Sequence, residues 1–255
     1  MPDRLFCIAG WAYDGKVLNG LAAYLPASFE THCLSPAHLL KEDINHASDS
    51  PPASAYARSL SRQINRQGGP CSIIAWSMGA VIALEAVSLF ALPVHKLVII
   101  NGTAKFCSAP DYHNGIPEKN IRAMKAGLLK NPEKTLSLFF HDAASPATPD
   151  AAVVDERIKT ALSFGTKTLR DGLTCLQETD LRQHLKDIAV PVLVIHGEQD
   201  RIIPQAAARF LHARLPQSTL HSFRNAGHSF CIDTPERVGQ MIFEFIAKGT
   251  ASDET

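Results

Sequence analysis

The chain lacks an excess of charge of either sign and lacks any long hydrophobic run. Its 255 residues carry 25 basic and 25 acidic side chains, so no overall field favours nucleic acid or a membrane surface. No apolar run could span a bilayer, and the residues after Met1 do not form the apolar core of a signal peptide. None of the six cysteines lies in a CxxC pair, which is typical of free thiols in a reducing compartment. We therefore expect a cytoplasmic globular protein.

Signatures of metal and nucleotide sites are missing as well. The eleven histidines include no HExxH pattern, and His32, His38 and His46 are scattered through loop-like sequence. The chain has neither a GxGxxG loop nor a Walker loop. We expect no metal ion and no nucleotide cofactor, so the chemistry has to come from side chains.

The most informative feature present is a serine at a predicted strand-to-helix turn. Residues 71–74 are apolar and follow a Gly-Gly-Pro turn, which predicts a buried strand, and residues 79–87 predict a helix. The connecting residues 75–79 (AWSMG) approach the G-x-S-x-G pattern of a nucleophile elbow, with Ala75 in place of the first glycine. Small residues on both sides let strand and helix approach around a strained turn. The alternative is that Ser77 belongs to an ordinary structural turn.

Two later segments deliver an acid and a base. Residues 191–195 predict a β-branched strand, and the turn after it carries Asp200. His228 follows a strand-like run at 220–223 and precedes an amphipathic helix that begins near Pro235. Parallel strands end at the same edge of a sheet, so these turns are expected to lie near the serine.

Chain order distinguishes the catalytic interpretation from structural alternatives. Asp200 could be a helix cap and His228 a loop residue, and Glu198 is a competing acid that points the other way if the strand continues. The order Ser77, Asp200, His228 is nevertheless that of α/β-hydrolases and of neither major serine-protease family. We predict that these three residues form a catalytic triad.

The spacing of strands predicts an α/β fold. Strand candidates begin near residues 5, 29, 71, 96, 191 and 219 and are separated by helical patterns. This pattern predicts a doubly wound, mostly parallel sheet of about six strands. We expect a helix at 17–25, another at 53–67, and between them, at 35–52, a polar loop with one helical turn.

Between residues 101 and 190 the strand pattern stops. Helical patterns follow near 117–131, 132–142, 150–163 and 165–178. A structureless loop of this length inside a domain is improbable. We expect a helical cap, residues 105–182, inserted into a core made of 1–104 and 183–255 and placed above the strand ends where such sheets bind ligands.

Candidate residues for oxyanion and substrate binding flank the predicted triad. A tetrahedral oxyanion needs two hydrogen-bond donors, for which we predict the backbone N–H groups of Met78 and Trp11. The alternative for Trp11 is a core aromatic. Phe139 and Phe140, with Leu136 and Leu138, are candidates for an acyl tunnel, although such clusters also occur as plain helix core.

The predicted cap has a basic bias that could dock an acidic carrier. A solvated surface is the alternative for each of its charges. The basic residues are Lys125, Lys130, Lys134, Arg157, Lys159, Lys167 and Arg170.

Over most of its length the chain resembles the α/β-hydrolase superfamily and, within it, the carboxylesterases of biotin synthesis. The resemblance rests on these segments: 10–11 (GW), 76–79 (WSMG), 106–109 (FCSA), 115–116 (GI), 134–135 (KT), 179–185 (TDLRQHL), the Asp200 loop and 226–228 (AGH).

The resemblance implies hydrolysis of the methyl ester of a pimeloyl chain carried by acyl-carrier protein. It implies that Trp11 helps to form the oxyanion hole, that Phe139 touches the chain and that cap arginines meet the carrier. Here Lys134 stands at one expected arginine and Leu138 replaces another. Ala9 replaces a histidine before the oxyanion loop, and the family's first β-hairpin is expected to be absent.

Two other functions remain open at this stage. One is a broad short-chain carboxylesterase or thioesterase with the same triad and no carrier partner. The other is a non-catalytic binding protein with a hydrolase-like pocket, against which the complete set of Ser77, Asp200 and His228 argues.

Overall fold

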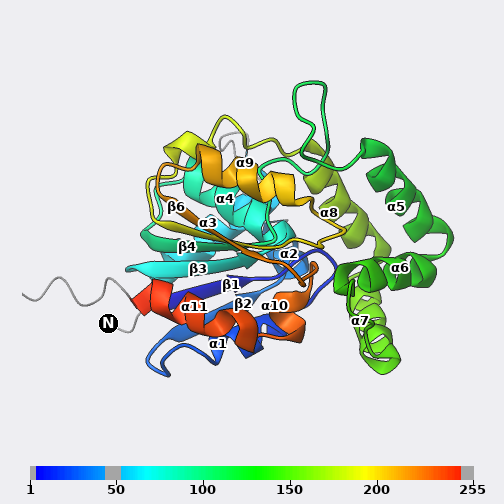
Figure 1. Ribbon diagram of the computed structural model, residues 1–255, viewed down its shortest axis with the longest axis horizontal. Helices are drawn as coiled ribbons and strands as arrows, with labels where there is room; N and C mark the ends of the chain where they lie inside the picture. The colour runs from blue at the N-terminus through cyan, green and yellow to red at the C-terminus, as the bar shows by residue number, and fades with distance from the viewer. Residues whose placement is uncertain (1–3, 44–52, 248–255) are drawn as a thin grey trace, which may run out of the picture.

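The computed structural model describes residues 4–43 and 53–247. Six strands form one sheet in the order β2-β1-β3-β4-β5-β6, and every pairing is parallel. The strands are β1 (Arg4–Ile8), β2 (Glu30–Leu34), β3 (Cys71–Trp76), β4 (Val94–Ile100), β5 (Val192–Gly197) and β6 (Ser218–Phe223). Helices cover both faces, with α4 and α9 on one and α1 and α11 on the other (Figure 1). The predicted doubly wound sheet of six strands is confirmed.

The central strands are continuous apolar runs because helices bury both of their faces. Every residue of β3 and β5 is buried. The edge strands differ: β2 is partly exposed, and β6 alternates between half-buried and exposed residues over most of its length. The core therefore centres on β1, β3, β4 and β5, and the loops that follow these strands have a rigid support.

Helices of the core connect the strands on both faces. They are α1 (Asn19–Ala22), α2 (Pro36–Asp43), α3 (Ala55–Gln67), α4 (Met78–Leu89), α9 (Gln205–Arg214), α10 (Phe230–Asp233) and α11 (Glu236–Ala247), with 3-10 turns η1 (Gly15–Leu18) and η2 (Leu185–Asp187). The expected helix at 17–25 is a 3-10 turn followed by the short α1.

The expectation of a loop with one helical turn at 35–52 is wrong for its first part. α2 runs for eight residues, and Ser35 opens it by accepting a hydrogen bond from the N–H of His38 at 3.3 Å. Proline suits the first helical position because it needs no N–H acceptor there. Ser35-Pro36 is therefore a helix-start signal, but the polar composition of residues 35–52 favoured a loop in the sequence analysis. The rest of the stretch, from residue 44 to 52, lies outside the described residues.

Four helices lie between β4 and β5, where a helical insertion was expected. They are α5 (Glu118–Lys130), α6 (Pro132–Ala144), α7 (Ala151–Ser163) and α8 (Thr166–Glu178), each within two residues of its predicted bounds. α5, α6 and α7 extend beyond one end of the sheet (Figure 1). α6 packs against both α5 and α7, and α8 packs against α5 and α2. Within the described residues, no helix has the length and apolarity needed to cross a membrane.

One close backbone approach sets the position of α4. A Cβ atom on Gly79 would overlap the carbonyl oxygen of Ile8 and lie 2.7 Å from that of Ala9. Helix α4 therefore touches the end of β1 through bare backbone, a contact beyond the approach of α4 to its own preceding strand that the sequence predicted.

We expect Gly79→Ala to lower the free energy of unfolding by about 1–3 kcal/mol, because the added methyl overpacks a backbone contact. Urea denaturation measures this change. Gly20→Ala is the control, since its Cβ would meet only ring carbons of Pro235, the nearest at 3.2 Å. Equal stability of the two variants would contradict the expectation.

Candidate active site

Ser77 occupies a sharp turn between β3 and α4. Its φ of 59° and ψ of −121° lie in a region that side chains rarely adopt, so the turn stores strain. The backbone is held there by a 3.0 Å hydrogen bond from the N–H of Ser77 to the carbonyl of Ile100. Ala75 is fully buried in β3, so the strand accommodates a methyl group where the elbow pattern has glycine. The side chain is thereby presented at the carboxyl edge of the sheet.

The structure brings Ser77, His228 and Asp200 into one hydrogen-bonded line. The Nε2 of His228 lies 2.7 Å from the Oγ of Ser77, and its Nδ1 lies 2.7 Å from the Oδ2 of Asp200. The side chains of His228 and Asp200 are fully buried. A carboxylate only accepts, so Nδ1 carries the proton and Nε2 is free to accept from the serine hydroxyl. This is the protonation state that a histidine base requires.

Asp200, not the competing Glu198, contacts the histidine. The second oxygen of Asp200, Oδ1, accepts hydrogen bonds from the N–H groups of Ile202 and Ile203 at 2.7 and 2.9 Å. These bonds fix the orientation of the carboxylate. Glu198 is exposed, and its N–H donates to the carbonyl of Phe223 at 3.0 Å.

A second histidine, His196 on β5, lies beside the acid and was not singled out from the sequence. Its Nε2 is 3.1 Å from the carbonyl of Ile203 and 4.0 Å from the Oδ2 of Asp200. Burial lowers the pKa of His196, although the charge of Asp200 opposes this effect. His196 is therefore neutral near pH 7, and His228 is the imidazole in hydrogen-bond contact with the carboxylate.

Asn101, directly after β4, is the most important residue that the sequence analysis missed. Its Nδ2 donates to the carbonyls of His228 and Gly227 at 2.6 and 3.1 Å, and its Oδ1 accepts from the N–H of Gly197 at 2.9 Å. The side chain thus ties the end of β5 to the histidine loop. Its φ of 44° is a conformation that asparagine tolerates better than most residues. An asparagine at the end of a predicted strand could therefore have indicated such a turn.

The residues predicted to supply the oxyanion donors belong to two segments that adjoin Ser77. Met78 is the first residue of α4, where backbone N–H groups lack acceptors within the helix. The loop with Trp11 passes Ser77 closely, because a Cβ on the preceding Gly10 would lie 3.3 Å from the serine Oγ. The indole Nε1 of Trp11 donates to the carbonyl of Leu169 at 2.8 Å.

The two phenylalanines predicted to touch substrate have different surroundings in the structure. The ring of Phe139 meets the edge of Trp11 at a centroid distance of 4.8 Å. Phe140 is fully buried, and its ring contacts are with Tyr13 at 5.1 Å and Phe139 at 5.4 Å. Phe139 is therefore the better placed of the pair to meet a ligand beside Trp11.

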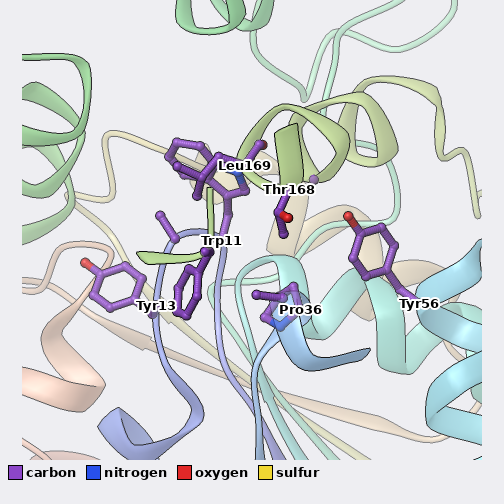
Figure 2. A pocket seen from close by; sticks show the side chains of 10 residues that line it. Trp11, Tyr13, Pro36, Tyr56, Thr168 and Leu169 are labelled. Carbon is purple, nitrogen blue, oxygen red and sulfur yellow. The ribbon is translucent and has the colours of Figure 1, made fainter. Parts of the chain in front are cut away.

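Two of the cavities beside this aromatic cluster bear on where a ligand could lie. One, of about 10 Å³, lies behind Trp11 between α2, α3 and α8, and the hydroxyl of Tyr56 points toward Thr168 across it (Figure 2). Its volume suits one water molecule and no acyl chain. The other is a groove of about 510 Å³ between α5 and α6, whose lining includes Met124, Leu138, Phe139 and Ile202. The groove reaches from Phe139 to the loop that follows Asp200.

Among the described residues no group of three or more His, Cys, Asp or Glu side chains could hold a metal ion. The arrangement matches what serine-dependent hydrolysis needs: a strained serine, a buried imidazole in contact with it and a carboxylate behind the imidazole.

The chain belongs to the alpha/beta hydrolase family, whose model matches residues 5–240. Two relatives named pimeloyl-[acyl-carrier protein] methyl ester esterase are similar to it. The protein from Nitrosomonas europaea is 28% identical over 240 residues, covering 92% of each chain. The protein from Aromatoleum aromaticum is 28% identical over 256 residues, covering 96% of this chain and 98% of its own.

Solved structures with the same fold are more distant in sequence. The esterase from Exiguobacterium antarcticum superposes with a TM-score of 0.82 at 17% identity, covering 96% of this chain and 92% of its own. A bromoperoxidase from Bacillus anthracis has a TM-score of 0.84 at 16% identity, covering 97% and 92%. These likenesses show the fold. The family match and the esterase-named relatives together support an esterase.

We expect Asn101→Ala to lower the free energy of unfolding by about 1–3 kcal/mol, because it leaves buried backbone groups of Gly197 and Gly227 without their partner. Chemical denaturation provides the measurement. Asn131→Ala is the control: Asn131 caps α6 at an exposed site, and such caps contribute about 1 kcal/mol. If Asn101→Ala lowered the free energy of unfolding no more than Asn131→Ala does, the buried hydrogen bonds of Asn101 would contribute no more to stability than a surface cap.

Proposed function

We propose that this protein is a serine carboxylesterase that hydrolyses the methyl ester of a pimeloyl chain carried by acyl-carrier protein. The observation that carries the proposal is the continuous line from the Ser77 Oγ through His228 to Asp200, with 2.7 Å at each contact. A serine hydroxyl is a weak nucleophile unless a base within hydrogen-bond reach removes its proton.

In the first half-reaction His228 takes the proton of Ser77 as the oxygen attacks the ester carbonyl. Asp200 holds the imidazole in orientation and stabilises the imidazolium that forms. The oxyanion of the tetrahedral intermediate is bound by the N–H groups of Met78 and Trp11, donors of a kind whose loss typically costs at least about a hundredfold in rate. The intermediate collapses when His228 protonates the leaving methanol, and an acyl-enzyme on Ser77 results.

In the second half-reaction water replaces methanol. His228 removes a proton from the water as it attacks the acyl carbonyl, and the same two N–H groups bind the second oxyanion. Collapse returns the proton to Ser77 and releases the free carboxylate. Each proton that leaves an oxygen is carried by the same imidazole, so no further acid or base is needed.

The α5–α6 groove supports the assignment of a carrier-linked acyl chain. Leu138 is 60% exposed at its edge, and Phe139 connects the groove to Trp11 next to the serine. Lys130 and Lys134 line the same groove and would face an acidic carrier. The relatives from Nitrosomonas europaea and Aromatoleum aromaticum carry the name of this activity. In this proposal residues 105–182 act as the cap that receives the carrier.

The cytoplasm is the proposed site of action. All six cysteines are free thiols, as expected for a reducing compartment. Biotin synthesis is the proposed context, through the resemblance of the sequence to the carboxylesterases of that pathway.

We expect Ser77→Ala to reduce ester hydrolysis by at least about a thousandfold, because the nucleophile is lost. Hydrolysis of p-nitrophenyl esters and covalent labelling by a fluorophosphonate measure the effect, and thermal denaturation checks that the fold persists. Ser88→Ala is the control, since the hydroxyl of Ser88 donates to the carbonyl of Glu85 in its own helix. Labelling of the Ser77→Ala protein, or no labelling of the wild type, would remove the serine mechanism.

We expect Lys130→Glu combined with Lys134→Glu to lower kcat/KM for a carrier-linked methyl ester about tenfold through electrostatic repulsion of an acidic carrier. Hydrolysis of p-nitrophenyl butyrate should be unchanged. Lys186→Glu, an exposed charge on η2, is the matched control. Equal effects on both substrates, or no preference of the wild type for the carrier-linked ester, would favour a broad short-chain esterase instead.

A further inference from the structure

We infer that Arg157 of α7 and Asp233 of α10 are positioning residues that tie the helical insertion to the loop carrying His228. The inference rests on the proposed serine mechanism, because it concerns how that histidine is held. It adds a role for residues that the triad itself does not contain.

A chain of polar contacts runs from α7 to the residue after the histidine. The Nη2 of Arg157 donates to the Oδ1 of Asp233 at 2.6 Å. The other oxygen of Asp233 accepts a hydrogen bond from the hydroxyl of Ser229. Ser229 follows His228 directly, so a restraint on this side chain is a restraint on the histidine backbone.

α6 reaches the same loop by a second route. The N–H of Ser229 donates to the carbonyl of Ala143 at 2.9 Å. A Cβ on Gly227 would overlap the carbonyl oxygen of Ser145, so the histidine loop lies directly under the end of α6. Two helices of the insertion therefore hold the residues on either side of His228.

The core holds the histidine from the opposite side. The carbonyl of His228 accepts from the indole Nε1 of Trp76 at 2.9 Å and from the Nδ2 of Asn101 at 2.6 Å. The carbonyl of His228 and the N–H of Ser229 belong to one peptide group, so the core binds this peptide through its oxygen and the insertion binds it through its nitrogen. The 2.7 Å contact between His228 and Ser77 depends on both.

The ion pair matters because the packing of α7 on the core is incomplete. α7 packs mainly against α6, and a cavity of about 510 Å³, lined by Tyr13 and Arg157 among others, lies between α7 and residues 12–17. The Arg157 side chain is only 15% exposed, and its guanidinium lies over the Tyr13 ring at 5.5 Å. Breaking a pair of this kind leaves a largely buried charge uncompensated, so the contact resists displacement of α7.

An ion pair elsewhere in the chain offers a matched comparison. Arg182 bonds to Asp180 and Asp111 at 2.8 and 2.9 Å, and its side chain is 17% exposed, close to the value for Arg157. It also lies over an aromatic ring, that of Tyr112. Within the described residues, none of these side chains has a hydrogen bond or ion pair to the loop that carries His228. Loss of the Arg182 pair should therefore lower stability as loss of the Arg157 pair does, but without displacing His228.

The test compares Arg157→Met, Arg157→Lys, Ser229→Ala and Arg182→Met in the full-length protein with p-nitrophenyl butyrate. We expect Arg157→Met to lower kcat about tenfold with KM within about twofold, because misplaced catalytic groups slow the chemical step more than binding. Arg157→Lys should recover most of kcat. Arg157→Met with Ser229→Ala should lose little more than the more impaired single variant, because both act through one network.

Hydrogen–deuterium exchange of residues 226–234 provides a readout that does not need activity. We expect faster exchange there in Arg157→Met than in Arg182→Met. Equal exchange in the two variants or an unchanged kcat in Arg157→Met overturns the inference. So does a double variant, Arg157→Met with Ser229→Ala, whose fold-loss in kcat equals the product of the two single-variant losses. A wild-type protein that hydrolyses no ester refutes the proposed function instead. The exchange comparison then still tests whether Arg157 restrains residues 226–234, because it needs no activity.

Discussion

Close approach of bare backbone at the carboxyl edge of the sheet is the constraint on which the rest of the structure depends. Gly79 brings α4 against the carbonyls that end β1, and Gly10 brings the following loop against Ser77. With no side chains between these segments, the serine turn is held at a positive φ that it would not adopt alone. The side chain of Ser77, the N-terminus of α4 and the loop of Trp11 consequently occupy one small region.

The helices between β4 and β5 are a structural part of this region. The carbonyls of Ala143 and Ser145 at the end of α6 meet the backbone around His228, and the Arg157–Asp233 pair reaches the same loop from α7. The groove between α5 and α6 lies on the same helices.

Much of this arrangement follows from local sequence patterns. The strand-to-helix turn at residues 75–79 and the acid after the β5 strand were predicted because apolar runs and turn residues mark strand ends. Asn101 was missed because its role lies in partners far apart in the chain, Gly197 and His228. The burial of Phe140 was equally invisible, since adjacent residues on a helix differ only in the direction that tertiary packing assigns them.

The sequence by itself determined the six strands, the four inserted helices and the order of serine, acid and base, because these depend on periodicity and on turn chemistry within short windows. Only the tertiary structure decided that Asp200 and not Glu198 reaches His228, and that Arg157 pairs with Asp233. Hydrogen bonds and ion pairs need their atoms within about 3–4 Å, and no local pattern encodes a distance between residues dozens of positions apart.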